Sequence, residues 1–540
     1  EHGSYAIIQL PRKGRSCVAR ESLKVGSVVF TEKPLVFLVT QAHVRDVCSR
    51  CLKKLDGRDS LSCQCDWHAW CSVACRAADE PIHCVECPAS QQVIRIAQEA
   101  GVDVDLLRIV TRMLVLAHLD AHFHASVSEL LTQREHFEGA LTEVVGKGVR
   151  AVLPLLGEVS SGPEEPLIDC ALNYACVVNG NSHGLADTQG RNTSVAFGLF
   201  PRVSMLNHSC RPNASYVADV GGAMTVRAIS DIAEGEEICV HYIDLYQPRR
   251  VRQQELKLSK FFDCECRRCA EEAADVRVAR GGFDSRLQEE GGGSGGLLDA
   301  LCCPRCGASR VLTPPKQAAA SEGHGEGAHS EAVSSEDSEP MSLECVGCGC
   351  KVSVEHINRV LGEGGGLLHR ARSLARQRQY ADARAILDSL ITRYEALPAG
   401  GESPTTERLL HPRHVLLFTS HATLINCTNA LDDYYAAVKS SRVVVSCLEL
   451  CGLAPSTETA DFSDTLGQAI DRLLASRKLP RKTAQQLREE MAETLYRATH
   501  VRSVCMGPNH PATQHAMATL ESLCPRHPLV EKARDLLVGE

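Results

Sequence analysis

The spacing of the cysteines constrains this 540-residue chain more than any other feature of its sequence. There are 27 cysteines, and most of them lie before residue 351 in closely spaced sets. The first residues, which begin at Glu1, show neither the basic nor the apolar segment of a secretory signal. In a chain without such a signal, closely spaced cysteines indicate zinc sites in a reducing compartment rather than disulfides. We therefore expect bound Zn²⁺ and a location in the cytoplasm and/or nucleus.

The first set of cysteines lies in residues 46–88 and supplies seven thiolates and one imidazole. Two tetrahedral zinc ions need eight ligands, which is the number available. So short a segment has few apolar residues, and we expect its folding to depend on bound metal. Cys84 is a further thiol that could replace a neighbour, and a set of unconnected reduced cysteines is the alternative. The candidate metal ligands of this segment are Cys48, Cys51, Cys63, Cys65, Cys71, Cys75, His83 and Cys87.

A second set of cysteines follows Phe262 and contains three thiolates, one fewer than a tetrahedral zinc site needs. Cys210 has no cysteine near it in the sequence, so it needs a distant partner and would complete this set. That pairing would bring the polar pair Asn207-His208 against the segment after Phe262. From the residues alone, this pair either satisfies buried backbone groups or contacts a ligand. The three thiolates belong to Cys264, Cys266 and Cys269.

A third set consists of two Cys-x2-Cys pairs, each followed by a glycine that permits a tight turn around a metal. A polar low-complexity segment, residues 316–342, separates the pairs, and a Gly-rich linker, residues 291–296, precedes them. We expect a structural zinc ion in a zinc-ribbon-like element. Unliganded cysteines are the alternative, and Cys302 and Cys350 are extra thiols that could compete. The expected ligands are Cys303, Cys306, Cys345 and Cys348.

Composition and charge limit the classes of protein to which the chain can belong. Apolar residues make up 44% of the sequence and charged residues 23%, as in a soluble globular protein. The net charge of −9 argues against a polycation that coats nucleic acid, and no basic stripe with interleaved aromatic residues occurs. No apolar run is long enough to span a bilayer. We expect neither nucleic-acid binding nor membrane association, and a monomer with three or four domains.

The pattern of apolar and turn residues divides the chain into strand-rich and helical segments. Residues 1–45 and 167–246 show short apolar runs broken by turn residues, which indicates strands. Residues 89–166 and 356–540 show the apolar spacing of helices. In the second of these helical segments, the spacing suggests paired helices of the tetratricopeptide (TPR-like) kind. We therefore predict an α+β protein.

Three motifs follow one another in the second part of the strand-rich sequence. The Asn-His-Ser-Cys motif at 207–210 comes first, the strand at 235–242 follows, and the cysteine set after Phe262 closes the region. In this order they resemble the SET methyltransferases of the SMYD (SET and MYND domain) family. Residues 46–88 resemble the MYND zinc finger of that family. The resemblance covers residues 5–270 in its motifs and the helical C-terminal part in general character.

The resemblance implies a SET domain that is split by a MYND finger and a helical insertion and followed by a post-SET zinc site. It implies an S-adenosylmethionine-dependent protein-lysine N-methyltransferase with histone and/or non-histone substrates and three or four zinc ions. A protein that presents a lysine is then the substrate, and peptides are partners of the finger. The implied domains are residues 1–45 (N-terminal part of SET), 46–88 (MYND finger), 89–166 (helical SET insertion), 167–246 (core SET), 247–280 (post-SET), 281–355 (linker and zinc-ribbon-like element) and 356–540 (TPR-like domain).

The resemblance assigns Tyr242 to the catalytic step, with its hydroxyl at the pore through which the methyl group passes. A lysine amine has a pKa of about 10.4 in water and must lose a proton before it attacks a sulfonium methyl group. An apolar channel and the charge of the sulfonium both lower that pKa. Catalysis then rests mostly on in-line positioning. Without the resemblance, a tyrosine at the end of a strand is more often a packing residue.

Residues from several separate segments would bind the cofactor, according to the same resemblance. Those near the N-terminus would bring backbone groups and positive charge to its carboxylate and ribose, and Phe262 would stack on its adenine ring. Taken alone, the Arg12–Arg15 run is a solvated turn, and Phe262 is equally well a core residue. The implied cofactor-binding residues are Lys13, Gly14, Arg15, Asn181, Ser204, Leu206, Asn207, His208, Tyr242 and Phe262.

Three residues depart from the family pattern. Ser16 stands where the family has a second glycine, Lys260 where it has a second channel tyrosine, and His183 where a large aromatic residue is usual. A cation at Lys260 could impair the access of a substrate lysine. The alternative function is therefore a catalytically weak or inactive SET-MYND scaffold, which binds partners through the zinc finger and the helical domain.

Overall fold

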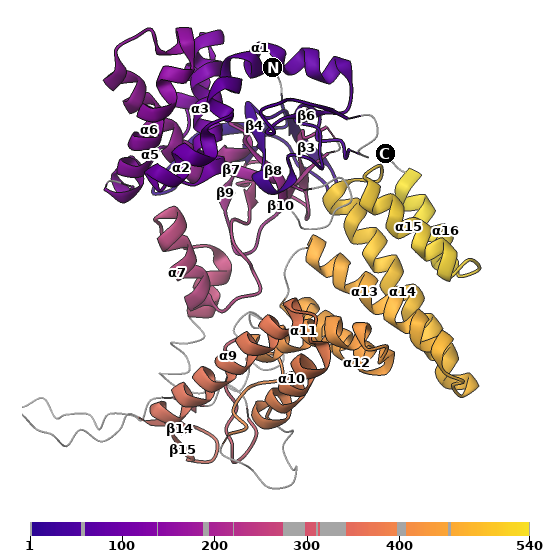
Figure 1. Cartoon of the computed structure of the whole chain (residues 1–540). Helices are drawn as coiled ribbons and strands as arrows, with labels where there is room; N and C mark the ends of the chain where they lie inside the picture. Colours follow the sequence, from indigo (N-terminus) through magenta and orange to yellow (C-terminus); the bar gives the residue numbers. More distant parts are fainter. Residues whose placement is uncertain are drawn as a thin grey trace, which may run out of the picture.

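The computed structural model describes residues 3–55, 60–137, 139–186, 194–219, 221–273, 298–308, 312–313, 342–396, 407–451 and 455–538. Over these residues the chain has a strand-rich N-terminal half and a long helical C-terminal part (Figure 1). The predicted α+β class is therefore confirmed. The Gly-rich linker at 291–296 and nearly all of the low-complexity segment at 316–342 lie outside the described residues.

Small sheets of two or three strands form the strand-rich half. Its strands are β1 (Tyr5–Leu10), β2 (Gly14–Ala19), β3 (Val28–Glu32), β4 (Val36–Val39), β5 (Leu61–Ser62), β6 (Ala69–Trp70), β7 (Ser182–Ala186), β8 (Ser194–Leu199), β9 (Asn207–His208), β10 (Ala214–Ala218), β11 (Met224–Ala228) and β12 (Cys239–Val240). The pairs β1-β2 and β5-β6 are antiparallel, and the sheets β10-β11-β3 and β4-β8-β7 have three strands each. Strand β9 pairs in parallel with β12, which lies much later in the chain.

A buried apolar cluster holds these sheets together. It contains Phe30 from β3, Ala196 from β8 and Val226 from β11, together with Phe200 and Leu206 from the loop before β9. Strand β11 buries every second residue, so one face of its sheet reaches this cluster. The loop before β9 is thereby fixed on the same core as the sheets.

Helices between β6 and β7 form a second apolar core beside the sheets (Figure 1). They are α1 (Val73–Ser90), α2 (Val93–Ala100), α3 (Val104–Leu119), α4 (Phe123–Ser128), α5 (Ala140–Val152) and α6 (Glu164–Asn181). The sequence predicts strands from residue 167, but α6 continues the helical part to Asn181. Ile168, Ala171 and Ala175 of α6 lie three or four residues apart and join the helical core, so packing favours the helix.

The C-terminal helices stack in consecutive pairs. After α7 (Arg249–Lys260), the elements are β13 (Leu312–Thr313), β14 (Ser342–Cys345), β15 (Lys351–Ser353), α9 (Val354–Arg376), α10 (Tyr380–Tyr394), α11 (Val415–Ala430), α12 (Tyr434–Leu450), α13 (Thr457–Ser476), α14 (Arg481–Met506), α15 (Pro511–Leu523) and α16 (Pro528–Val538). Helix α9 packs on α10, α11 on α12, and α13 on α14. The long helical part agrees with the apolar spacing of the sequence, and a TPR-like repeat stays a prediction.

Helix α14 connects the helical part to the strand-rich half. It packs against β10 and β11, and its Val501 and Val504 share an apolar cluster with Ile229, the residue after β11. The hydroxyl of Ser215 donates to the carbonyl of Cys505 at 3.4 Å. Figure 1 shows α14, drawn in yellow, beside β10. The helical part is therefore docked through α14 on the sheet that contains β10 and β11.

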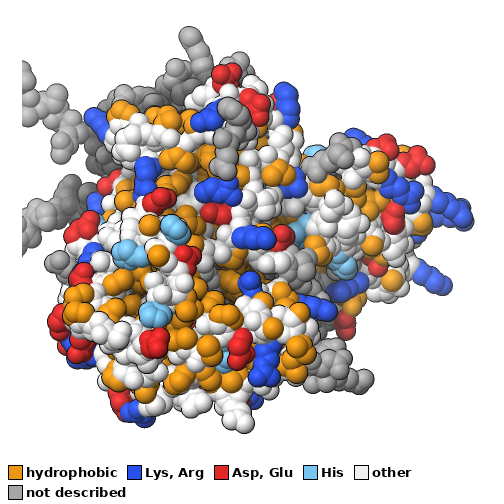
Figure 2. Space-filling view, turned by 90° about the horizontal axis from the view of Figure 1, so that it is seen from above, with side chains coloured by type: hydrophobic (Ala, Val, Ile, Leu, Met, Phe, Trp, Pro, Cys, Tyr) orange, Lys and Arg blue, Asp and Glu red, His pale blue; other side chains and the backbone are white. Residues whose placement is uncertain are grey.

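Charges of both signs are mixed on the surface. On the face shown in Figure 2, the Lys and Arg side chains of the described residues are interspersed with Asp and Glu side chains. That face therefore carries no continuous basic stripe of the kind that binds nucleic acid. None of the described helices is long and apolar enough to cross a bilayer.

Candidate active site

A cavity lies where the β1-β2 hairpin, the end of α6, the β9-β12 pair and the segment after α7 meet. Its volume is about 850 Å³, and it is lined by aromatic, cationic and backbone groups. All residues that the resemblance assigns to the cofactor line this one cavity, although they come from segments far apart in the sequence. These residues are Lys13, Gly14, Arg15, Asn181, Ser204, Leu206, Asn207, His208, Tyr242 and Phe262.

The parallel pairing of β9 with β12 places Tyr242 beside the Asn207-His208 pair. The Tyr242 hydroxyl donates to the carbonyl of Leu206 at 2.6 Å, and its backbone N–H donates to Nδ1 of His208 at 3.0 Å. Burial raises the pKa of Tyr242, so its hydroxyl stays protonated. Tyr242 is therefore a fixed hydroxyl in the cavity wall and not a proton acceptor.

The side chain of Asn207 is bound to the β1-β2 hairpin. Its Nδ2 donates to the Arg15 carbonyl at 3.1 Å, to the Ser16 hydroxyl at 2.8 Å and to Oε1 of Glu237 at 3.0 Å. Glu237 also accepts a hydrogen bond from the amine of Lys13. Ser16, which departs from the family pattern, thus supports the site as a hydrogen-bond acceptor.

Glu237 is a site residue that the sequence analysis missed. Burial opposes its ionisation, but hydrogen bonds from Lys13 and Asn207 prevail and lower its pKa. The same bond to Glu237 raises the pKa of Lys13, so both groups are charged at neutral pH. The signal in the sequence is the Gly-Glu-Glu turn before β12. Only the fold distinguishes Glu237 from its neighbour Glu236, which is exposed.

His208 uses both of its ring nitrogens within the protein. Nδ1 accepts from the backbone of Tyr242, and Nε2 lies 3.3 Å from Sγ of Cys210. Burial lowers the pKa of His208 to about 4, so its ring is neutral. The centroid of this ring lies 6.3 Å from that of Phe262. Since the ring is so engaged, the backbone of His208 is the part available to a ligand.

The helical insertion also contributes to the cavity. The Asn181 amide donates to the carbonyl of Leu131 at 2.9 Å, and the Arg15 guanidinium donates to the carbonyl of Glu129. The Ser204 hydroxyl donates to the carbonyl of Asn181 at 3.4 Å. The loop after α4 therefore forms part of the cavity wall, and it fixes the end of α6.

Two of the departures from the family pattern lie together beside Tyr242. The rings of His183 and Tyr216 meet edge-on, with centroids 5.2 Å apart. Burial and, to a smaller extent, the charge of Lys260 lower the pKa of His183 to about 4. The Nζ of Lys260 lies 5.6 Å from the centroid of the Tyr242 ring and donates to the Gly180 carbonyl at 2.8 Å. The cavity wall next to Tyr242 is thus more polar than the family pattern implies.

Cys210 lies against the cysteine set that follows Phe262. Its Sγ is 3.6 Å from that of Cys269 and 4.0 Å from that of Cys264. A tetrahedral site with Zn–S bonds of about 2.3 Å has sulfur atoms roughly 3.8 Å apart, so this geometry fits a zinc ion. The sulfur atoms that lie within 4.8 Å of one another are those of Cys210, Cys264, Cys266 and Cys269.

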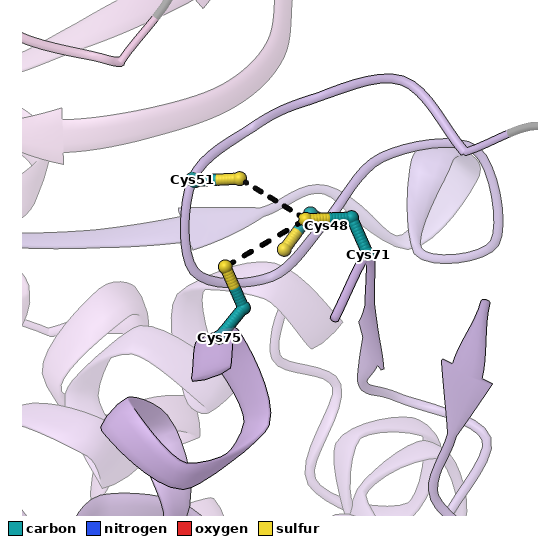
Figure 3. Close-up of side chains that lie close together, drawn as sticks. All are labelled: Cys48, Cys51, Cys71 and Cys75. Carbon is teal, nitrogen blue, oxygen red and sulfur yellow. Dashed lines mark hydrogen bonds between the residues drawn. The ribbon is translucent and has the colours of Figure 1, made fainter. Parts of the chain in front are cut away.

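The ligands of residues 46–88 separate into two interleaved groups, each with its ligand atoms within 4.8 Å of one another. Figure 3 shows the first group, in which Cys71 lies 3.6 Å from Cys51 and 3.7 Å from Cys75 between their sulfur atoms. The first group is Cys48, Cys51, Cys71 and Cys75, and the second is Cys63, Cys65, His83 and Cys87.

The two Cys-x2-Cys pairs of the predicted zinc-ribbon-like element form a fourth group. Facing sulfur atoms of the two pairs lie 3.6 and 3.7 Å apart. The extra thiols of Cys84, Cys302 and Cys350 lie outside the four groups, so they do not compete for a place in this geometry. Three of the groups consist of four cysteines, and the remaining group has three cysteines and His83. Zinc prefers such sulfur and imidazole donors, so the four groups of the described residues fit four zinc ions. The group consists of Cys303, Cys306, Cys345 and Cys348.

A buried charged cluster supports the second ligand group of residues 46–88. Nε2 of His68 lies 3.1 Å from Glu86, and Nδ1 of the same ring lies 3.9 Å from the Cys65 sulfur. Arg112 of α3 binds Glu86 at 2.7 Å, and its charge lowers the pKa of Glu86 in spite of burial. Neither His68 nor Glu86 is among the predicted site residues. Such partners orient metal ligands, and sequence spacing alone does not reveal them.

Residues 14–243 match the family profile of the SET domain. This range begins with β2 and ends one residue after Tyr242, so it contains the β9-β12 pair and most of the cavity wall. The chain therefore contains a SET domain over these residues. The cysteine group that includes Cys210 lies mostly beyond the SET match, and the two groups of residues 46–88 lie within it.

Curated proteins that resemble this SET-domain protein are methyltransferases by name. Histone-lysine N-methyltransferase ASHR1 of Arabidopsis thaliana is 27% identical over 270 residues, which are 49% of this chain and 54% of that protein. N-lysine methyltransferase SMYD2 of Homo sapiens is 28% identical over 272 residues, or 49% and 60%. SMYD2-B of Xenopus laevis is 27% identical over 269 residues, with the same shares. The match therefore spans little more than half of these relatives, and it confirms the resemblance inferred from the motifs.

Proposed function

We propose that this SET-domain protein is an S-adenosylmethionine-dependent protein-lysine N-methyltransferase with histone and/or non-histone substrates. The names of the relatives support this class of reaction. The observation that carries the proposal is the position of Tyr242. Its hydroxyl is fixed on the Leu206 carbonyl at 2.6 Å, in the wall of a cavity that all of the expected cofactor residues line.

The cavity fits S-adenosylmethionine in its size and in the groups that line it. A volume of about 850 Å³ lies within the range of roughly 300–1,000 Å³ that is typical of small-molecule sites. Phe262 offers an aromatic face to adenine. Lys13 and Arg15 bring positive charge toward a carboxylate. When bound, the cofactor supplies an electrophilic methyl group on a sulfonium.

The residues of the chain would prepare a substrate lysine for this transfer. A lysine amine with a pKa of about 10.4 in water loses its proton more readily in a cavity lined by buried rings. Tyr242 stays protonated and presents its oxygen beside the Leu206 carbonyl, so two oxygens orient the amine. Positioning of this kind supplies much of the rate of a bimolecular reaction.

The substitution Tyr242→Phe tests the proposal at the residue that carries it. The change removes the oxygen next to the reacting groups, and we expect the rate of methyl transfer to fall by about 100- to 1,000-fold. The assay incubates the full chain with methyl-labelled cofactor and a mixture of protein substrates. Zinc content should equal that of the unchanged chain, since Tyr242 is not a member of any of the four ligand groups. An unchanged rate would contradict the role of Tyr242.

A catalytically weak or inactive scaffold is the second candidate, and one observation favours it. The amine of Lys260 lies in the cavity beside Tyr242, where a substrate lysine would have to bind. Cofactor binding without transfer to any protein, unaffected by Tyr242→Phe, would support the scaffold. Partners would then bind through the finger and the helical part.

We also assign roles to the parts of the molecule outside the cavity. Each of the four ligand groups would hold one zinc ion, and the MYND-like finger at 46–88 would bind peptides. The TPR-like part, residues 356–540, would control substrate access, and the packing of α14 on β10 and β11 supports this role. The abundance of reduced thiols favours the cytoplasm and/or nucleus. We expect the protein to act as a monomer.

A further inference from the structure

An amine of the chain itself lies in the candidate active site. Lys260 is the last residue of α7, and its Nζ lies 5.6 Å from the centroid of the Tyr242 ring. The same Nζ donates to the carbonyl of Gly180 at 2.8 Å. Gly180, Tyr242 and Lys260 all line the cavity that also contains the predicted cofactor residues. The side chain therefore lies where an external lysine would be expected.

The backbone at Lys260 is held by the residues around it. Phe261 has a φ of 62°, in the left-handed region, and its ring stacks on that of His136 with centroids 4.0 Å apart. Phe137 meets the Phe261 ring edge-on at 5.4 Å, and Nε2 of Gln133 donates to the carbonyl of Lys260 at 3.4 Å. Non-glycine residues seldom adopt this φ, so the contacts of Phe261 hold an uncommon backbone conformation. These contacts thereby fix the position of Lys260 at the end of α7.

The surroundings of the amine are poor in negative charge. Among the described residues no carboxylate forms an ion pair with Lys260, and Asp263 is paired with Lys257 at 3.3 Å. The neighbouring rings are neutral, because burial lowers the pKa of His183 to about 4 and raises the pKa of Tyr216. Burial lowers the pKa of Lys260 itself. More of its amine is therefore unprotonated, and hence nucleophilic, than for a lysine at the surface.

We propose that Lys260 is a methyl acceptor of its own active site, so that the chain methylates itself in cis at this residue. This inference rests on the proposed methyltransferase function. The ammonium first loses a proton to water in the cavity. The nitrogen then forms a bond to the methyl carbon while the carbon–sulfur bond breaks, and the electron pair of that bond stays on sulfur. The products are methylated Lys260 and S-adenosylhomocysteine.

Methylation at this position would change the channel and leave its charge intact. Methyl-lysine keeps its positive charge but has one N–H donor fewer and a larger head group. The added methyl group would compete with the N–H that now donates to the Gly180 carbonyl. Self-methylation would therefore alter the access of external lysines to Tyr242.

The test is an incubation of the purified full chain with methyl-labelled S-adenosylmethionine and no other protein. We expect the mass of the chain to increase by one or more methyl groups and peptide sequencing to place them on Lys260. The rate per chain should be independent of chain concentration, because the reaction is intramolecular. A rate per chain that rises with concentration would overturn the reaction in cis.

Three variants sharpen this experiment. Lys260→Arg should remove the incorporation at this site, and Tyr242→Phe should slow it strongly. Lys257→Arg, an exposed lysine on the same helix, is the matched control and should be methylated at Lys260 as fast as the unchanged chain. Incorporation that persists undiminished in Lys260→Arg would overturn the assignment.

A second incubation, with a mixture of proteins present, separates this inference from the function on which it rests. If external proteins are methylated while Lys260 stays unmodified, the self-methylation is wrong and the methyltransferase stands. If nothing is methylated although the cofactor binds, the proposed function fails, and the inference fails with it. Methylation of Lys260 alone supports both and marks the chain as its own substrate.

The reactivity of the amine can also be measured without the cofactor. Reductive methylation with ¹³C-formaldehyde labels lysines chemically, and Lys260→Arg identifies the signal of Lys260 in the NMR spectrum. We expect this signal to titrate at a lower pH than the signal of Lys257. Equal titration midpoints for the two lysines would overturn the proposal, since Lys260 would then have no more free amine than a lysine in water.

Discussion

Glu237 prepares the cavity for a ligand by fixing two residues at once. Its carboxylate accepts from the amine of Lys13 and from the amide of Asn207. Both partners line the cavity, and they lie on opposite sides of the junction between the β1-β2 hairpin and β9. Groups that are already in place lose less freedom on binding, so a rigid arrangement favours affinity.

The substitution Glu237→Gln keeps the shape of this side chain and removes its charge. Lys13 then loses its ion pair, while the amide oxygen can still accept from Asn207. A charged hydrogen bond contributes roughly 1.5–3 kcal/mol, so we expect the affinity for S-adenosylhomocysteine to fall by about 10- to 100-fold. Isothermal titration calorimetry on the full chain measures this change.

Glu234→Gln is the matched control, because Glu234 is exposed in the same turn. The affinity of this variant for S-adenosylhomocysteine should equal that of the unchanged chain.

Acid titration gives a second signature of Glu237. Its lowered pKa means that the ionised form stabilises the folded chain above the ordinary value of 4.5, and that this contribution is lost as the pH falls through the lowered pKa. Glu237→Gln should therefore lose less stability on acidification. Equal losses would show that the pair contributes nothing to folding.

Among the helices, α7 connects a cysteine group to the cavity. Arg252 of this helix is fully buried, and its guanidinium lies 3.3 Å from the Cys210 sulfur and 2.6 Å from Glu272. Its positive charge offsets part of the negative charge that four thiolates would still carry around one Zn²⁺ ion. The helix ends at Lys260, two residues before Phe262, so this cysteine group and the cavity share one support.

Removal of one sulfur from this group tests that connection. We expect Cys264→Ser to lose one zinc ion per chain and to bind S-adenosylhomocysteine poorly, because α7 and Phe262 lose their anchor. Elemental analysis and calorimetry measure the two effects. Cys84→Ser, which changes an exposed cysteine outside the four groups, should alter neither. Loss of zinc with unchanged affinity would show that the cavity does not depend on the metal.

Helix α3 contributes Arg112 to a buried ionic cluster with Asp79 and Glu86 of α1. Arg112→Met would leave Asp79 and Glu86 buried without their cation, and we expect the free energy of unfolding to fall by about 3–5 kcal/mol. Urea denaturation followed by circular dichroism measures this loss. Arg95→Met breaks an exposed pair with Glu99 on α2 and should cost less than about 1 kcal/mol. Similar losses in both variants would contradict the special role of the buried cluster.

At the scale of the whole molecule, Gly507 lies where the helical part meets the sheets. It ends α14 with a φ of 95°, and a Cβ at this position would collide with the Arg227 guanidinium on β11. Tyr246 makes a second connection, with its hydroxyl 3.1 Å from that of Ser456 and 3.3 Å from that of Thr459. A Cβ at Gly507 would therefore force the Arg227 guanidinium to move, and the positive φ disfavours any side chain there.

The substitution Gly507→Ala should loosen this contact, because both the backbone conformation and the close approach disfavour a Cβ. We expect faster hydrogen exchange in β10 and β11, and a change in peptide selectivity if the helical part controls access. Gly362→Ala in α9 is the control, since a Cβ there meets nothing within 4 Å, and it should raise stability by about 0.5–1 kcal/mol. Unchanged exchange in Gly507→Ala would show that the contact tolerates the side chain.

The order of the motifs and most of the metal chemistry could be predicted from the residues because both depend on local spacing. The distant Cys210 was predicted because the set after Phe262 lacks a fourth ligand. Two cysteines separated by two residues can reach one ion in almost any fold, and the sixteen predicted ligands form four groups in the described structure. The apolar period of the C-terminal helices is local in the same sense. At α6, the local turn residues favoured strands, and the packing of its apolar face decided for the helix.

Only the tertiary structure decided which distant side chains face one another. Glu237 rather than Glu236 forms the ion pair with Lys13, and the Ser16 hydroxyl accepts a hydrogen bond from Asn207. The amine of Lys260 lies in the cavity beside Tyr242. No spacing rule encodes such contacts, because each depends on how separate segments pack and on which groups that packing buries. The residues themselves thus determined which chemistry is available to this protein, and the packing of its core determined which of them share a site.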